Sequence, residues 1–176
     1  MARARRAVSG EIEVRRGSLA DVEALARHRA EMFRDMGALS DEAYAPLVEA
    51  ARRWYERAIP AGEYVAWLAH PAGRPDEVVA GAGMQFRDLI PRPSRDGGYL
   101  VEGRQGLIVN VYTERPWRRR GIAELLMREL LTWARENGVE SLVLHASDEG
   151  RALYERLGFV ATNEMGYRGP PAAEQS

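Results

Sequence analysis

The chain has 176 residues, a formal net charge of −1 and, histidine aside, 25 basic residues that are all arginine. The absence of cysteine excludes disulfides, thiolate metal sites and a cysteine nucleophile, and the absence of lysine excludes a P-loop and Schiff-base chemistry. Because the charge is balanced and no signal peptide or long apolar segment occurs, we expect a cytoplasmic protein without nucleic-acid or membrane partners. The length suits one domain, predicted over residues 11–168 between a disordered arm at 1–10 and a disordered tail at 169–176.

The first third of the chain predicts one strand followed by two helices. Alternating residues indicate a short strand over Ile12–Arg15, and Ser18 is typical of the N-cap of a helix that ends near Gly37. A second helix is expected to begin at Ser40 or Asp41, because apolar residues then recur at helical spacing until a Pro-Ala-Gly turn stops them. The chain therefore begins with a β-α-α arrangement.

Strands dominate the middle of the chain. The segments Tyr64–Ala69 and Val78–Phe86 are predicted strands, and the turn residues between them indicate an antiparallel hairpin. Arg87–Gln105 contains two prolines and three glycines and is expected to be a long surface loop. Leu107–Thr113 is an apolar run that is typical of a buried strand.

The last third alternates helices and strands. Gly121–Asn137 has the apolar stripe of an amphipathic helix, and Ser141–Ala146 follows as a strand. A short helix over Glu149–Leu157 and a closing strand over Val160–Tyr167 complete the order β-α-α-β-β-β-α-β-α-β. Because strands outnumber helices and run together in the middle, this order predicts a mixed α/β (α+β) fold rather than a doubly wound sheet.

The junction between the strand Leu107–Thr113 and the next helix is the most informative segment. It reads Arg-Arg-Arg-Gly-Ile-Ala from Arg118 to Ala123. The first turn of a helix has unpaired backbone N–H groups and partial positive charge, and Gly121 has no Cβ to keep a ligand away from the main chain. With arginines around it, this junction predicts a binding site for a diphosphate.

Two sequence blocks carry a resemblance to a known family. Val109–Ala123 contains Arg-x-x-Gly-x-Ala directly after a strand, with Pro116 upstream, and Leu153–Phe159 reads Leu-Tyr-Glu-Arg-Leu-Gly-Phe. In this order and on these elements, the two blocks resemble the acyl-CoA-binding segment and the Leu-Tyr-x-x-Leu-Gly-Phe motif of the GNAT superfamily of N-acyltransferases. The resemblance implies a largely antiparallel, twisted sheet flanked by helices.

The resemblance also implies how acetyl-CoA, the co-substrate, would bind. Backbone N–H groups from Arg119 to Ala123 would hold the CoA diphosphate, and the strand edge at Val111 and Thr113 would pair with the pantetheine arm. A bulge would splay this strand from its neighbour, and the N–H of Val111 would polarise the thioester carbonyl. Ser147 stands where many members have a cofactor-contacting asparagine. The implied cofactor-binding set is Val111, Thr113, Arg118, Arg119, Arg120, Gly121, Ile122, Ala123 and Ser147.

The reaction implied by the resemblance is acetyl-CoA-dependent N-acetylation. A primary amine of an unidentified small-molecule or peptide acceptor would attack the thioester directly in a ternary complex. Tyr154 matches the family tyrosine near the sulfur, and a phenol with a pKa of about 10 can protonate the leaving thiolate at pH 7. A non-catalytic acyl-CoA-binding module and an O-acyltransferase are the alternatives. The resemblance is also compatible with a homodimer.

The general base and the acceptor site stay open at this stage. His145 at the end of a predicted strand, Glu114 just past another strand and a water chain are alternatives for the base. The loop Arg87–Gln105 is one candidate wall of the acceptor site. A helical stripe is a second candidate wall, although core packing explains it better: His28, Met32, Phe33 and Met36. No spacing suggests a metal site, so none is expected.

Overall fold

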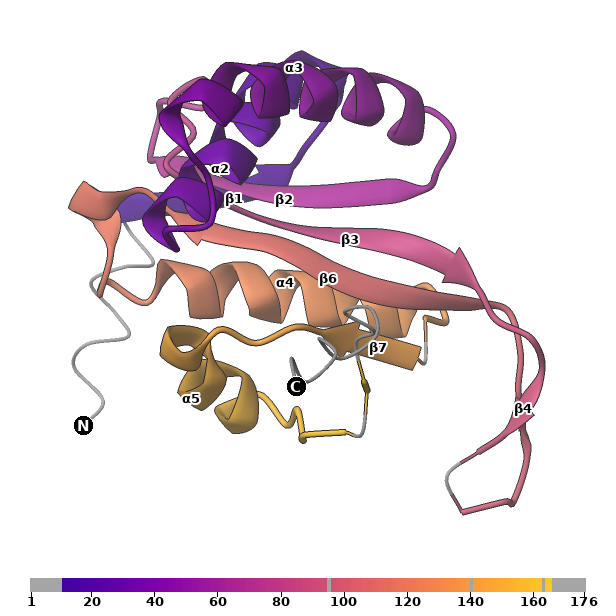
Figure 1. The fold of residues 1–176 in the computed structure, drawn as a ribbon. Helices are drawn as coiled ribbons and strands as arrows, with labels where there is room; N and C mark the ends of the chain where they lie inside the picture. Colours follow the sequence, from indigo (N-terminus) through magenta and orange to yellow (C-terminus); the bar gives the residue numbers. More distant parts are fainter. Residues whose placement is uncertain (1–10, 95, 140, 163, 166–176) are drawn as a thin grey trace, which may run out of the picture. The chain divides into compact units, whose positions relative to one another are not determined.

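The computed structural model describes residues 11–94, 96–139, 141–162 and 164–165 (Figure 1). The chain divides after His145 into two compact units, of which the first holds most of the regular structure. The elements of the first unit are β1 (Ile12–Arg16), η1 (Leu19–Asp21), α2 (Val22–Asp35), α3 (Asp41–Ala58), β2 (Tyr64–Pro71), β3 (Ala80–Asp88), β4 (Arg92–Pro93), β5 (Leu100–Val101), β6 (Arg104–Thr113), η2 (Arg115–Trp117), α4 (Ile122–Glu136) and β7 (Ser141–Leu144). The described part of the second unit contains α5 (Asp148–Arg156).

A five-stranded sheet forms the centre of the first unit, in the order β1-β2-β3-β6-β7. The first four strands of this order pair antiparallel, and β7 pairs parallel to β6. Figure 1 shows α2 and α3 over one face of the sheet and α4 along the other. The predicted fold class, a mixed and largely antiparallel sheet flanked by helices, is confirmed.

The helices are held on the sheet by their apolar stripes. Leu25 of α2 and Tyr55 of α3 are buried in one core with Leu68 of β2, and α4 buries Ile122 and Leu126. Full burial of one such aliphatic side chain stabilises the fold by roughly 1.5–3 kcal/mol. The stripes therefore position the strand–helix junctions on which the site depends. No helix in the described part of the chain combines the length and the apolar character that a membrane span requires.

The predicted N-caps of the first two helices are confirmed. The Ser18 hydroxyl accepts a hydrogen bond from the N–H of Ala20, and Asp21 completes a capping box by accepting from the Ser18 N–H at 2.8 Å. The first turn after Ser18 is a short 3-10 helix, so α2 itself begins at Val22. Ser40 caps α3 by accepting from a backbone N–H of its first turn at 3.3 Å.

The expectation of a long loop over Arg87–Gln105 is wrong in part. Strands β3 and β6 continue to pair as far as Asp88 opposite Arg104, and the hydrogen bond from Leu89 N–H to Gly103 C=O extends the ladder at 2.8 Å. Beyond it, β4 and β5 form a small antiparallel sheet. Figure 1 shows this arm projecting past the end of β3. Its prolines and glycines obscured the alternation by which a strand is recognised in sequence.

The closing strand predicted over Val160–Tyr167 is not found in its described residues. No strand occurs at residues 160–162 or 164–165 of the predicted closing strand, while residues 163, 166 and 167 lie outside the described part. Val160 and Met165 are exposed, at 65% and 93%, so these two apolar residues of the predicted closing strand are not packed. The predicted arm at 1–10 and tail at 169–176 lie outside the described residues.

Candidate active site

Strand β6 carries a bulge where it pairs with β3. Gly81 lies opposite Tyr112, whereas Gly83 lies opposite Val109, so β6 has one residue more than β3 across this step. Asn110 lies in the bulge and has a φ of 56°. This angle is in the left-handed region, which asparagine tolerates better than most residues. Because a bulge bends its strand and increases the local twist, it redirects the end of β6.

Strand β6 leaves its other neighbour at almost the same point. The parallel pairing with β7 ends at Ile108 and Leu144. Within the described residues, Val109–Thr113 therefore has β3 along one edge and no strand along the other. An open strand edge can accept an extended ligand as an added strand. Val111 and Thr113, the residues predicted to pair with pantetheine, lie on this edge.

The loop from β6 into α4, predicted to bind a diphosphate, contains two residues with a left-handed backbone. Arg119 has a φ of 64° and Gly121, the N-cap of α4, has a φ of 80°. A turn that contains left-handed residues can gather successive N–H groups into a concave nest that binds anions. The N-cap residue Gly121 has no side chain that could cap α4, and the first intrahelical bond runs from Leu125 N–H to Gly121 C=O at 3.1 Å, so the preceding N–H groups have no helical acceptor. A Cβ on Gly121 would meet open space, so glycine is required by its backbone angle.

The side chain of Arg118 is directed to helix α2 instead. Its guanidinium forms an ion pair with Asp35 and donates from Nε to the C=O of Thr113 at 2.9 Å. Arg115 binds the same carboxylate at 2.5 Å. Burial alone would raise the pKa of Asp35, but the hydrogen bonds from Arg115 and Arg118 outweigh it and lower that pKa. Arg118 thus tethers the loop to α2, and the candidate binders of an anion in this loop are its backbone N–H groups.

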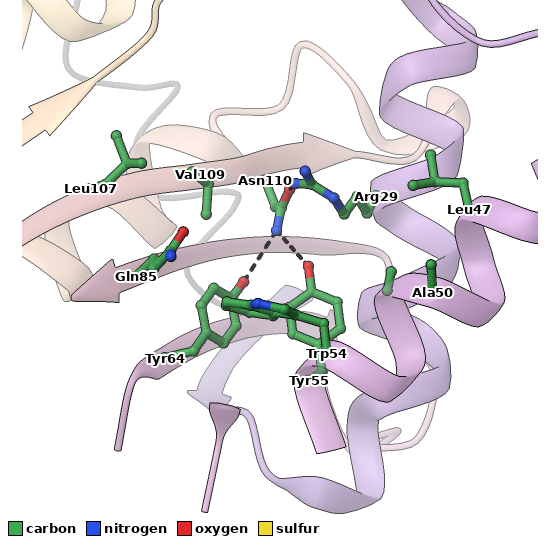
Figure 2. Close-up of a pocket in the computed structure, with 11 residues that line it drawn as sticks. Arg29, Leu47, Ala50, Trp54, Tyr55, Tyr64, Gln85, Leu107, Val109 and Asn110 are labelled. Carbon is green, nitrogen blue, oxygen red and sulfur yellow. Dashed lines mark hydrogen bonds between the residues drawn. The ribbon is translucent and has the colours of Figure 1, made fainter. Parts of the chain in front are cut away.

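A cavity of about 400 Å³ opens between the sheet and the helices α2 and α3 (Figure 2). Val109 and Asn110 of β6 form part of its wall, so the cavity reaches the bulge. Aromatic and aliphatic side chains make up most of the remaining surface. The lining residues are Arg29, Leu47, Ala50, Ala51, Trp54, Tyr55, Tyr64, Gln85, Leu107, Val109 and Asn110.

Asn110 joins the bulge to both helices through its side chain. Its Nδ2 donates to the hydroxyls of Tyr55 and Tyr64 at 2.6 and 3.3 Å, and its Oδ1 accepts from Arg29 at 2.6 Å (Figure 2). Gly83 leaves room for this network, since a Cβ there would lie 1.8 Å from the Tyr64 hydroxyl. Burial raises the pKa of both tyrosines, so their hydroxyls remain protonated.

The model of the Acetyltransferase (GNAT) family matches residues 23–159. The chain belongs to the GNAT family. Glucosamine 6-phosphate N-acetyltransferase 1 of Oryza sativa subsp. japonica is 29% identical to it over 124 residues, which are 69% of this chain and 70% of that protein. The crystal structure of a GCN5-related N-acetyltransferase from Ralstonia eutropha JMP134 is similar with a TM-score of 0.77 and 31% identity, over 89% of this chain and 97% of that one. A predicted acetyltransferase from Clostridium acetobutylicum, crystallised with acetyl-CoA, has a TM-score of 0.72 and 26% identity, over 90% and 96% of the two chains.

Within this GNAT fold, the contacts of Glu114 make it a weak candidate for the general base. Its Oε1 accepts from Arg27 at 2.7 Å and lies 3.1 Å from Nε2 of His28. Burial would raise the pKa of Glu114, but the hydrogen bonds from Arg27 and His28 outweigh it and lower that pKa. Burial lowers the pKa of His28, whose side chain is almost fully enclosed. A carboxylate of low pKa that is already paired is a weak base.

Arg29 is the residue of α2 that lines the cavity. It is not one of the residues of the helical stripe that the sequence suggested as a wall. His28 is buried in the protein, and Met36 is 51% exposed, so the stripe forms neither a single core face nor a cavity wall. None of the described residues of Arg87–Gln105 lines this cavity, so the loop as the other candidate wall stays a prediction. The sequence contained one signal for the role of Asn110, which is that a polar asparagine interrupts the apolar run Leu107–Thr113.

Two predicted residues lie in the second unit. Ser147 caps α5 by accepting from the N–H of Gly150 at 3.2 Å, which leaves its own hydroxyl hydrogen free to donate. Tyr154 packs against Phe159 with ring centres 6.1 Å apart. Gly150 allows the ring to lie close, because a Cβ there would be 2.8 Å from Tyr154 Cε2. Burial raises the pKa of Tyr154, so its phenol stays protonated at neutral pH.

The remaining base candidate, His145, follows the last residue of β7 and is exposed. His145 is the residue directly after Leu144, with which the pairing of β7 to β6 ends. In the described part of the chain, no three His, Asp or Glu side chains are grouped to hold a metal ion.

Proposed function

We propose that this GNAT chain is an N-acetyltransferase that transfers the acetyl group of acetyl-CoA to a primary amine by direct attack in a ternary complex. The observation that carries the proposal is the left-handed loop at Arg119 and Gly121, which leads from the bulged, open edge of β6 into a helix whose N-cap is glycine. A diphosphate fits this backbone because it offers converging N–H groups and open space at Gly121. The similar acetyltransferase crystallised with acetyl-CoA supports the same ligand.

The binding roles follow from the backbone. The N–H groups from Arg119 to Ala123 are assigned to the diphosphate, with Arg119 and Arg120 at the rim and Arg118 as the tether. The edge at Val111 and Thr113 is assigned to the pantetheine arm, and Ser147 supplies a further hydrogen-bond donor. When bound, acetyl-CoA supplies an acetyl group that is activated as a thioester.

Two groups are assigned to the chemistry. The N–H of Val111 directly follows the bulge at Asn110, and we assign it the polarisation of the thioester carbonyl. Tyr154 is assigned the protonation of the departing thiolate, which its raised pKa supports because a phenol must carry its proton to donate it. No covalent bond to the protein is required, consistent with a chain that has no cysteine.

The attacking amine must be neutral, so its proton has to leave the cavity. The lining contains no histidine, aspartate or glutamate among the described residues, and its two tyrosines have raised pKa values. A water chain is therefore the favoured base, with His145 as its outer acceptor. A cavity of about 400 Å³ suits a small-molecule acceptor, and the rice relative is named for an amino-sugar phosphate.

Thiol release from acetyl-CoA across a panel of amines, together with calorimetric titration of CoA, tests the proposal. We expect CoA to bind and at least one amine to be acetylated with release of one thiol per product. Failure to bind CoA would refute the assignment of the loop. Binding without thiol release from any amine would favour the non-catalytic module, and a product acetylated on oxygen would favour the O-acyltransferase.

A further inference from the structure

Among the described residues that line the cavity, Arg29 alone carries a formal charge. None of the described residues that line the cavity is a carboxylate that could balance it. One guanidinium N–H group is used by Asn110, which is neutral, and the side chain also lies 5.0 Å from the ring centre of Phe33. A guanidinium has five N–H donors, so Arg29 retains donors for a ligand.

Arg29 differs in this respect from every other arginine on the two helices that cover the cavity. Helices α2 and α3 hold six arginines, all of them described. Five form ion pairs with a carboxylate at 3.0 Å or less, and Arg29 forms none with any described residue. The five paired residues are Arg27, Arg34, Arg52, Arg53 and Arg57. Among the described residues, Arg29 is therefore a cation without a carboxylate counter-ion, and it lies where a cavity reaches the bulge.

The neighbouring polar groups are also hydrogen-bond donors. The hydroxyl oxygens of Tyr55 and Tyr64 accept from Asn110, and burial keeps both phenols protonated. The carbonyl oxygen of Asn110 is already occupied by Arg29. An ammonium group would find few acceptors here and a like charge beside it, whereas a carboxylate or phosphate would find a guanidinium within a half-buried, aromatic setting.

We infer that Arg29 binds an anionic group on the acceptor, so that the substrate is an amine that also carries a carboxylate or a phosphate. This inference rests on the proposed function and narrows its substrate class. The anion at Arg29 holds the acceptor in the cavity beside Val109 and Asn110, and its amine is presented toward the open edge of β6. Trp54 and Leu107 supply an apolar wall for the body of the acceptor.

Matched pairs of amines test the inference. Glucosamine 6-phosphate is compared with glucosamine, and L-phenylalanine with phenethylamine, by thiol release from acetyl-CoA. In at least one pair the anionic member should have a kcat/KM roughly 10- to 100-fold higher, the factor expected for one hydrogen-bonded charge. The pair that shows the preference identifies the anion as phosphate or carboxylate.

Variants assign the preference to Arg29. Arg29→Met should reduce the ratio within the preferred pair to below about 3-fold, chiefly through KM, as expected when a charged contact is lost. Arg29→Lys, which keeps the charge, should retain much of the ratio. Arg53→Met is the control, since Arg53 is on α3 but pairs with Glu49 outside the cavity, and it should leave the ratio unchanged.

The inference and the proposed function fail in different ways. Preference for the uncharged member in both pairs, or an anionic preference that survives in Arg29→Met, would overturn the inference alone. Turnover of other amines without turnover of either anionic one would do the same. If Arg29→Met does not fold, Arg29→Lys is compared with Arg53→Met. A ratio that is reduced in part in Arg29→Lys and unchanged in Arg53→Met supports the inference, and the same ratio in both variants overturns it. Absence of thiol release with every amine would overturn the proposed function.

Discussion

The side-chain amide of Asn110 donates a hydrogen bond of 2.6 Å to the hydroxyl of Tyr55 and so connects the bulge of β6 to helix α3. The same asparagine holds the left-handed backbone angle of the bulge and accepts from Arg29. One residue therefore couples the wall of the cavity to the strand edge assigned to acetyl-CoA. A change at Asn110 should affect both the stability of the protein and the alignment of its two substrates.

Replacement of Asn110 separates these contributions. Asn110→Gly keeps the freedom to adopt a positive φ but removes three side-chain hydrogen bonds, and should lower the free energy of unfolding by about 1–3 kcal/mol. Asn110→Ala adds left-handed strain of about 1 kcal/mol and should be the less stable of the two. Urea unfolding measures both values. An alanine variant as stable as the glycine variant would show that the bulge relaxes.

Gly121→Ala tests the diphosphate loop, with Gly138→Ala as its matched control. Both glycines flank α4 with a positive φ, of 80° and 67°, and a Cβ at either would meet open space. Each substitution should cost about 1–2 kcal/mol of stability through strain alone. Gly121→Ala should in addition raise the KM for acetyl-CoA, because it alters the backbone of the nest. Equal effects of the two variants on this KM would contradict the assignment.

The tether between Asp35 and Arg118 predicts a dependence of stability on pH. The pKa of Asp35 is lower in the folded state than in the unfolded one, so its ion pairs stabilise the protein above the unfolded value of about 4. This contribution is lost as the pH falls through the lower, folded pKa. Asp35→Asn should therefore be less stable than wild type near pH 7, by roughly 1 kcal/mol because both arginines are partly exposed to solvent.

Urea unfolding at neutral and acidic pH measures this difference. The gap between wild type and Asp35→Asn should narrow toward acid, since protonation removes the charge in wild type as well. Glu63→Gln, which breaks the exposed pair with Arg57, is the control and should change stability much less. A gap for Asp35→Asn that is constant with pH would mean that packing, and not the ion pairs, is responsible.

Tyr154→Phe tests the assigned acid. Turnover should fall by about 100-fold or more, the usual contribution of general acid catalysis, while the affinity for acetyl-CoA is retained. The alkaline limb of the pH–rate profile that reports the phenol should also disappear, and in wild type it should lie above the ordinary tyrosine value, because burial raises the pKa of Tyr154. Tyr99→Phe, at an exposed position of the first unit, should leave the profile unchanged. Unchanged turnover in Tyr154→Phe would remove this residue from the mechanism.

Local patterns in the sequence predicted much of the fold and the loop of the candidate site. The stripe of α4 and the Arg-x-x-Gly-x-Ala junction are visible because helix periodicity and glycine use are properties of neighbouring residues. The cavity was not predicted because its residues come from α2, α3, β2, β3 and β6, and because the rotation of α2 decides whether His28 or Arg29 faces it. The left-handed angle of Asn110 depends on pairing with β3, which no local pattern specifies.

The central claim is tested most directly by mass spectrometry of the reaction with acetyl-CoA and glucosamine 6-phosphate or L-phenylalanine, with thiol release followed in the same sample. The account predicts a product that has gained one acetyl group on its amine nitrogen, formed with one equivalent of free CoA, and a rate that depends on both substrates together. Thiol release without an acetylated amine, or no product from any amine with CoA bound, would contradict it.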